Sequence, residues 1–147
     1  MSYTVDANLL LYASDASSPF HEQASTFLGQ MAHGPEIVYL FWPVLMGYLR
    51  IATHPGVFAS PLTPEEAMGN IERLLALPHI QTPGEHERFW SSYRGVADAS
   101  VRGNLVPDAY VAALMHENGV RTIWTHDRDF RRFDGVEVRD PFDLSGP

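Results

Sequence analysis

The 147-residue chain contains no cysteine. This absence excludes disulfide bonds and thiolate metal sites, and it fits a reducing compartment. Long apolar runs are missing too, because the stretch from Ile37 to Leu49 is interrupted by Pro43 and Gly47 and is too short to span a bilayer. The first residues also lack the basic and apolar regions of a signal peptide. We therefore expect a cytoplasmic protein without a membrane segment.

Positive charge is scarce. The chain has 10 Lys and Arg residues against 18 Asp and Glu residues, and its formal net charge is −8. Modules that bind nucleic acid passively usually neutralise phosphates with many basic side chains, so this balance disfavours them. An enzyme that binds divalent cations must instead concentrate carboxylates, and the bound ions reverse the local field. The acidic surplus therefore permits a metal-dependent nuclease, and it suits a basic protein partner.

The composition is that of an ordinary globular protein, with 45% hydrophobic and 19% charged residues. No repeat or linker divides the chain, so we predict a single domain over residues 1–147. Apolar and β-branched runs predict strands at residues 3–5, 37–40, 122–124 and 136–138. Apolar periodicity and start signals predict helices over 7–13 and 20–31, and further helices beginning at Pro43, Thr63, Thr82 and Pro107. Alternating strands and helices indicate an α/β architecture with a mainly parallel sheet.

Two of these helix starts have the pattern of a capping box. Thr63 is followed three residues later by Glu66, and Thr82 by Glu85. In such a box the threonine hydroxyl accepts from the backbone of the third helical residue, whose own side chain accepts from the threonine backbone. The sequence thus predicts that both segments open helices, and that Gly119 ends the helix that begins at Pro107.

Acidic side chains follow two of the predicted strands. Asp6 comes directly after the first strand, and Asp127 and Asp129 follow the strand that ends at Trp124. Ligands of parallel sheets bind at the carboxyl ends of the strands, so these acids converge if their strands are neighbours. Asp108, in the first turn of a predicted helix, joins them if that helix begins at the same edge. Such carboxylates repel one another unless a cation neutralises them, and oxygen ligands suit Mg²⁺ or Mn²⁺.

Plain structural roles stay open for each of these acids. Asp108 is a favourable charge against a helix dipole, and Asp6 is a possible N-cap for the helix that begins at Ala7. Asp127 and Asp129 are compatible with a solvated turn whose charges are balanced by nearby arginines.

Three motifs change the balance between these interpretations. They are VDANLLLY at residues 5–12, PDAYVAAL at 107–114 and THDRDF at 125–130. Together, and in this order, they resemble the signatures of PIN-domain nucleases, especially VapC-type toxins of bacterial toxin–antitoxin pairs. The resemblance covers nearly the whole chain. It implies a three-layer α/β/α sandwich and Mg²⁺- or Mn²⁺-dependent endonucleolytic cleavage of RNA by an activated water.

The resemblance also implies roles for particular residues. Four carboxylates would form the catalytic metal site, with the last in a direct or supporting position: Asp6, Asp108, Asp127 and Asp129. Two side chains would orient these acids by hydrogen bonds, as the surroundings of a metal require: Asn8 and Thr125. Considered alone, each of these two is equally compatible with a turn asparagine or a strand-end threonine.

One position departs from the family pattern. The family usually carries a glutamate on the helix after the second strand, and Gly47 stands at that place. A glycine inside a helix costs about 1 kcal/mol relative to alanine and supplies no ligand. The chain then represents either a branch that works without this acid or a variant with impaired metal binding. Glu36 precedes the strand, so we do not expect it to compensate.

The function predicted from these observations is a toxin endoribonuclease. Its expected partners are an RNA substrate, a second copy of the chain in a homodimer, and a cognate VapB-type antitoxin that places a basic segment across the acidic cleft. A first alternative, motivated by Gly47, is a catalytically weakened, antitoxin-bound RNA-binding module. A second is a small-molecule phosphohydrolase with an aspartate nucleophile. It is disfavoured because the segment from Asp6 to Asn8 lacks the second aspartate usual in such enzymes.

Overall fold

The computed structural model describes residues 1–143 and contains a five-stranded sheet in the order β3-β2-β1-β4-β5. All neighbouring strands are parallel. The strands are β1 (Ser2–Val5), β2 (Ile37–Tyr39), β3 (Ile80–Gln81), β4 (Thr122–Trp124) and β5 (Glu137–Arg139). The predicted parallel sheet is therefore confirmed, with β3 as an additional strand that the sequence patterns did not predict.

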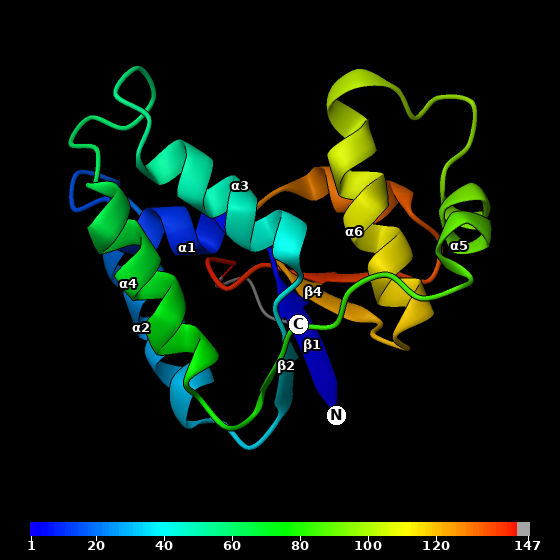
Figure 1. Ribbon diagram of the computed structural model, residues 1–147, viewed down its shortest axis with the longest axis horizontal. Coiled ribbons are helices and arrows are strands. Elements are labelled where there is room, and N and C mark those ends of the chain that lie inside the picture. Colours follow the sequence, from blue (N-terminus) through cyan, green and yellow to red (C-terminus); the bar gives the residue numbers. More distant parts are fainter. Residues whose placement is uncertain (144–147) are drawn as a thin grey trace.

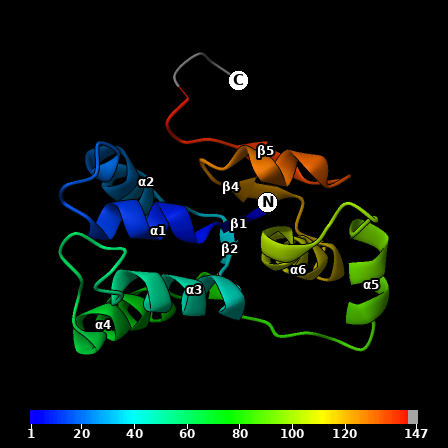
Figure 2. The same cartoon turned by 90° about the horizontal axis from the view of Figure 1, so that it is seen from above.

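Helices pack on both faces of the sheet, as Figures 1 and 2 show. They are α1 (Ala7–Ser14), α2 (His21–His33), α3 (Trp42–Ala52), α4 (Pro64–Leu75), α5 (Phe89–Val96) and α6 (Val106–Glu117). Helices α1, α2 and α4 lie on one side and α5 and α6 on the other, while α3 contacts both α1 and α6. This arrangement is the predicted α/β/α sandwich. None of the helices within residues 1–143 is long and apolar enough to cross a membrane.

The central strands are buried on both faces. Val5, Val38 and Ile123 are fully buried, as expected for β-branched residues in a parallel sheet covered by helices. Thr4 is buried as well, and its hydroxyl donates a 2.6 Å hydrogen bond to the backbone oxygen of Tyr39. These contacts fix β1 in the middle of the sheet.

The register of β1 and β4 determines what lies at the carboxyl edge. Val5 is the partner of Trp124, so the residues that follow them, Asp6 and Thr125, emerge side by side. The amide of Asp6 donates to the oxygen of Trp124 at 3.0 Å, which extends the ladder by one step. The sheet thus brings together two segments that lie more than a hundred residues apart in the chain.

Only one of the two predicted capping boxes forms. At α4, the Thr63 hydroxyl accepts from the amide of Glu66 at 3.1 Å, and the Glu66 carboxylate accepts from the amide of Thr63 at 3.2 Å. The box predicted at Thr82 is wrong, because α5 begins only at Phe89. The Glu85 side chain accepts instead from the hydroxyl of Tyr110 on α6.

Helix α6 begins as the sequence predicts. Pro107 occupies its first turn, where no backbone donor is needed, and Asp108 follows it. Gly119 adopts a φ of 69° just after the helix, the left-handed conformation that ends many helices and that glycine tolerates best. The first turn of α6 lies at the same edge as the carboxyl ends of the strands (Figure 1). Asp108 therefore reaches that edge.

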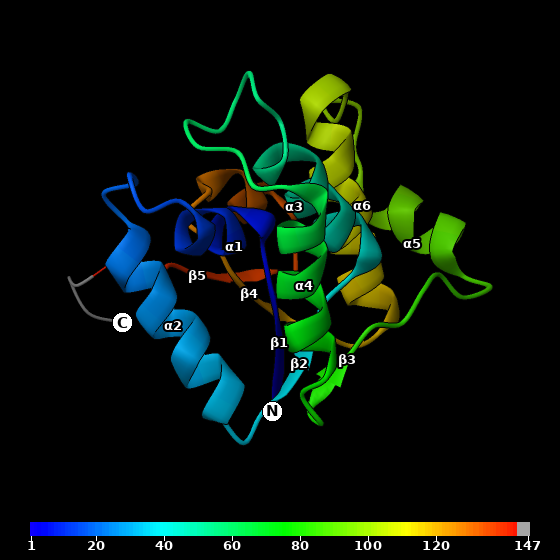
Figure 3. The ribbon, with the colours of Figure 1, turned by 60° about the vertical axis from the view of Figure 1, so that its left-hand side comes forward.

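An apolar groove lies beside α1. Figure 3 shows α2 and α4 on either side of α1. The groove has a volume of about 440 Å³, and Leu10, Leu28, Ile71 and Leu74 are among the side chains that line it.

Candidate active site

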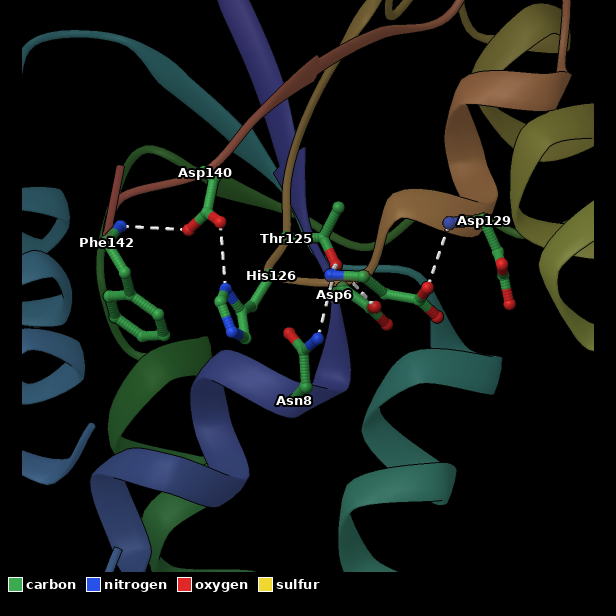
Figure 4. Close-up of polar contacts among 8 residues, drawn as sticks. Asp6, Asn8, Thr125, His126, Asp129, Asp140 and Phe142 are labelled. Carbon is green, nitrogen blue, oxygen red and sulfur yellow. Dashed lines mark hydrogen bonds and ion pairs between the residues drawn. The ribbon is translucent and has the colours of Figure 1, made fainter. Parts of the chain in front are cut away.

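Thr125 is the centre of the hydrogen bonds at the carboxyl edge (Figure 4). Its hydroxyl has one proton, which it donates to Asp6 Oδ2 at 2.8 Å. The same oxygen accepts from Asn8 Nδ2 at 3.2 Å and from the amide of Asp127 at 2.9 Å. Thr125 is only 1% exposed, so water does not compete for these bonds. One buried hydroxyl therefore connects three of the residues singled out from the sequence.

Asp6 is held from two directions. Its Oδ1 accepts from the amide of Ala7 at 2.7 Å, so Asp6 is also the N-cap of α1, and its Oδ2 accepts from Thr125. Burial raises the pKa of Asp6, the hydrogen bonds from Thr125 and Ala7 oppose that rise, and the charge of Asp127 adds to it. Asp6 thus caps α1 and also lies at the carboxyl edge of the sheet, bonded to Thr125.

Asn8 is fixed in orientation by the same network. Because the Thr125 proton is already given to Asp6, Asn8 must present its amide nitrogen to Thr125. Its Oδ1 is then left buried without a hydrogen-bond partner among residues 1–143. Asn8 thus supports Thr125 through its amide nitrogen, while its Oδ1 stays an unused acceptor among the described residues.

Three carboxylates gather beside this network. Asp108, Asp127 and Asp129 each offer an oxygen within 4.8 Å of the others. Asp129 is placed by its own amide, which donates to Asp127 Oδ1 at 2.9 Å at the start of the short helical turn η2 (Arg128–Arg132). Asp6 lies beside this group of three rather than within it. The structure therefore brings three of the four predicted ligands together and places the fourth next to them.

The electrostatics of this group are those of crowded acids. Burial, reinforced by the charges of Asp6, Asp127 and Asp129, raises the pKa of Asp108 to about 7, while Arg132 opposes the shift. Burial also raises the pKa of the nearby Tyr12, with further contributions from Asp6 and other acids. The group thus carries excess negative potential that a cation would relieve.

The donor set fits a small divalent cation. Oxygen ligands lie about 2.1 Å from Mg²⁺, so opposite ligands are about 4.2 Å apart, close to the spacing found here. All of the gathered donors are carboxylate oxygens, the ligand type that Mg²⁺ and Mn²⁺ accept readily. Small side-chain adjustments would suffice to bind such an ion.

Helix α3 leaves space at the position of the missing acid. A Cβ added at Gly47 would meet no heavy atom within 4 Å. Glu36 does not replace it, because it precedes β2 at the opposite end of the sheet, where its charge raises the pKa of Tyr3 after the larger effect of burial. The chain therefore has room for a larger side chain at Gly47 but carries none there.

One acid beside the site, Asp140, was not predicted from the sequence. The carboxylate of Asp140 accepts a 2.8 Å hydrogen bond from Nδ1 of His126, and His126 directly precedes Asp127 in the chain. Asp140 immediately follows β5, so the strand-edge rule that predicted Asp6 and Asp127 could also have found it.

Comparison with known proteins agrees with this arrangement. The sequence model of the PIN domain matches residues 3–136, and the chain therefore belongs to the PIN-domain family. Within that family it is similar to VapC ribonucleases. It is 51% identical to Ribonuclease VapC48 of Mycobacterium tuberculosis, over 97% of this chain and 99% of the relative. It is 35% identical to Ribonuclease VapC43 of the same organism, over 95% of both chains. These matches confirm the resemblance inferred from the three motifs.

Solved structures share the fold. Mycobacterium tuberculosis VapC20, described as a sarcin-ricin loop cleaving toxin, superposes with a TM-score of 0.65 at 17% identity, covering 92% of this chain and 98% of that one. FitAcB from Neisseria gonorrhoeae superposes with a TM-score of 0.64 at 22% identity, covering 98% of this chain and 100% of that one. DNA-bound VapBC from Salmonella typhimurium superposes with a TM-score of 0.65 at 14% identity, covering 96% of this chain and 98% of that one. At these identities the likeness concerns the fold.

Proposed function

We propose that this protein is a VapC-type toxin that cleaves RNA as a metal-dependent endoribonuclease. The observation that carries the proposal is the gathering of Asp108, Asp127 and Asp129, with Asp6 beside them, at the carboxyl edge of a PIN-domain sheet. The similarity to VapC ribonucleases along almost the whole chain supports the same function.

In this proposal the four acids have two different roles. Asp108, Asp127 and Asp129 would hold Mg²⁺ or Mn²⁺, and Asp6 would either complete the ligand set or bind a water of the ion. Such an ion polarises a phosphodiester and lowers the pKa of a water. Thr125 and Asn8 keep Asp6 and the acidic turn in place, so that little rearrangement is needed when substrate arrives.

The surroundings of the acids suit a polyanionic substrate. Arg128, Arg131 and Arg132 are exposed on η2, the turn that carries Asp129, and none of them forms an ion pair with a described residue. Guanidinium groups without an ion-pair partner bind phosphate oxygens well, and Arg132 in addition lies close enough to Asp108 for its charge to lower the pKa of that acid. We infer that they contact RNA phosphates near the cleaved bond, which accounts for nucleic-acid binding despite the net charge of −8.

The proposal includes a cognate VapB-type antitoxin. Several structural neighbours are toxin–antitoxin complexes, among them VapBC-1 of nontypeable Haemophilus influenzae and a complex from Klebsiella pneumoniae. The acidic edge would attract a basic antitoxin segment, and the apolar groove beside α1 would suit the apolar side of such a segment. We further propose a cytoplasmic homodimer, since Trp42, Met46 and Trp90 are large apolar side chains exposed on α3 and α5.

RNA cleavage by the purified protein with Mg²⁺ or Mn²⁺ tests this function. Asp108→Asn removes one ligand charge and should lower cleavage by more than about 100-fold, beyond what loss of a supporting partner costs. Asp134→Asn is the matched control, because Asp134 is an exposed acid just after η2 and outside the group. Wild-type cleavage by Asp108→Asn, or equal cleavage in EDTA, would contradict the proposal.

Gly47 favours a second candidate, a weakened enzyme that mainly binds RNA. The space around its Cβ position lets Gly47→Glu restore an acid without a clash. If the natural chain is weakened, this variant should cleave RNA much faster than wild type, whereas Gly47→Gln should not. Equal rates of RNA cleavage by wild type, Gly47→Glu and Gly47→Gln would instead show that this branch works without the acid.

A further inference from the structure

The chain continues past the residues matched by the PIN domain, which end at 136, and turns back onto the acidic site. Residues 139–142, here called the C-terminal segment, begin with the last residue of β5 and lie at the same edge of the sheet as Asp127. The oxygen of Arg139 accepts from the amide of Thr125 at 2.9 Å, and the next residue, Asp140, accepts from His126 at 2.8 Å. Two consecutive residues of the segment thus hold two consecutive residues of the acidic turn.

Asp140 links the turn to the rest of the segment (Figure 4). Its Oδ2 accepts from His126 Nδ1, while its Oδ1 accepts from the amide of Phe142 at 2.9 Å. An ionised carboxylate only accepts, so His126 must carry a proton on Nδ1 whatever its charge state. The side chain of Asp140 is 20% exposed and that of His126 is 35% exposed, so both bonds are partly shielded from water.

Four rings anchor this connection to the helical layer. Phe142 stacks on Phe20 with centroids 4.8 Å apart and planes within 2°. The His126 ring lies 4.6 Å from Phe20 and 5.1 Å from Phe142, and Tyr12 of α1 packs against all three rings. Aromatic pairs of this kind contribute beyond their buried area. The cluster therefore joins α1, the start of α2, the acidic turn and the C-terminal segment.

The neighbours of His126 in the chain are the residues that build the site. Thr125 bonds to Asp6 and receives the amide of Asp127, and Asp127 receives the amide of Asp129. A rotation of the backbone at His126 would therefore displace Thr125 on one side and the acidic group on the other. Metal sites depend strongly on such supporting contacts.

We propose that His126, Asp140 and Phe142 are positioning residues, and that the C-terminal segment sets the affinity of the acidic group for a divalent cation. This inference rests on the proposed metal-dependent function. It extends that function by assigning part of the site to residues outside the PIN-domain match. The segment acts through the hydrogen bond from His126 to Asp140 and through the stacked rings, not through contact with substrate.

The test measures binding of Mn²⁺ alone to the full-length chain by titration calorimetry, with thermal unfolding of each variant as a check on folding. His126→Phe keeps a ring but loses the donor, and it should weaken Mn²⁺ binding about tenfold. His126→Asn keeps a donor near the Nδ1 position and should bind Mn²⁺ more tightly than His126→Phe. The Mn²⁺ affinities of Asp140→Asn and Phe142→Ala should lie between those of His126→Phe and wild type.

The control is Asp134→Asn, an exposed change in the turn before β5 that makes no hydrogen bond or ion pair with residues 139–142, and its Mn²⁺ affinity should equal that of wild type. RNA cleavage at saturating Mn²⁺ should return to near the wild-type kcat in the positioning variants, with KM for RNA unchanged.

Three results would overturn the inference. The first is wild-type Mn²⁺ affinity in both His126→Phe and Asp140→Asn. The second is a raised KM for RNA with unchanged Mn²⁺ affinity, which would place His126 in contact with substrate. The third is equal weakening in His126→Phe and His126→Asn. A wild-type chain that binds no Mn²⁺ would instead contradict the proposed function itself, so the two failures are distinguishable.

Discussion

Asp6 and Asp108 lie at the same edge of the sheet, but their carboxylates are held in different ways. Asp6 is partly buried, and its carboxylate accepts hydrogen bonds from Thr125 and the Ala7 amide. Asp108 is partly buried as well, but no hydrogen bond within residues 1–143 holds its carboxylate: burial raises its pKa, and the charges of Asp6, Asp127 and Asp129 add to that rise. We call the first region the held half (Asp6, Asn8, Thr125) and the second the open half (Asp108, Asp127, Asp129). The hydrogen bonds of the held half keep its geometry in the absence of a cation. The open half is electrostatically unfavourable until a cation binds.

Breaking the held half should have the largest effect on stability. Thr125→Val keeps the shape of the side chain but removes the proton given to Asp6 and the acceptor used by Asn8 and the Asp127 amide. Leaving buried groups unpaired should lower the free energy of unfolding by about 3 kcal/mol and RNA cleavage by about 10- to 100-fold. Urea unfolding and initial cleavage rates measure both. Thr125→Ser retains the hydroxyl and should recover most of each loss; a failure to do so would argue against the network.

The open half should respond to pH in two opposite ways. The pKa of Asp108 is raised from 3.8 to about 7 in the folded protein. The unfolded chain therefore releases this proton first, and the metal-free protein should lose stability as pH rises from about 4 to 7. Because Asp108 is half-exposed, solvent screening limits this loss to about 1–2 kcal/mol. Affinity for Mn²⁺ should rise over the same interval, since the ligand must be ionised.

Thermal unfolding and Mn²⁺ titration at pH 5 and pH 8 separate these two trends. In Asp108→Asn the part of the stability change that Asp108 causes should vanish, and the variant should be more stable than wild type at pH 8. An identical pH dependence in variant and wild type would show that Asp108 is not the responsible group.

A change at Gly47 on α3 should have the smallest effect on stability. Gly47→Ala meets no neighbouring atom and should stabilise the protein by about 1 kcal/mol, since glycine is a poor helix residue. Cleavage by Gly47→Ala should match wild type, because no ligand is added. Calorimetric unfolding provides the measurement, and a destabilised variant would mean that α3 needs the close approach that glycine permits.

The sequence predicted the held half and most of the open half because both follow from one rule about strand ends. Asp6 and Thr125 directly follow paired strands, so a correct assignment of β1 and β4 was enough to place them together. Asp108 required the additional condition that α6 begins at the same edge, and only the family resemblance favoured that condition over a plain helix-dipole role.

The errors have local physical causes. Strand β3 contains only Ile80 and Gln81, too few residues to show any periodicity. The box at Thr82 had the right residue types, but Gly84 weakens helix formation there and Glu85 finds a partner in Tyr110, on a distant helix. Such tertiary competition is not visible in a window of four residues. The role of Asp140 was missed because the edge rule was not extended to β5.

The position of β1 in the middle of the sheet has a consequence for synthesis of the chain. Asp6 is translated well before its hydrogen-bond partner Thr125, which lies 119 residues later in the chain. Strand β1 therefore waits for β4 before the central pairing is complete, and a domain of this kind folds as a unit. A nascent chain that has not yet released Thr125 from the ribosome holds no assembled acidic site. The acidic site thus forms only after Thr125 and the acidic turn that follows it have been synthesised.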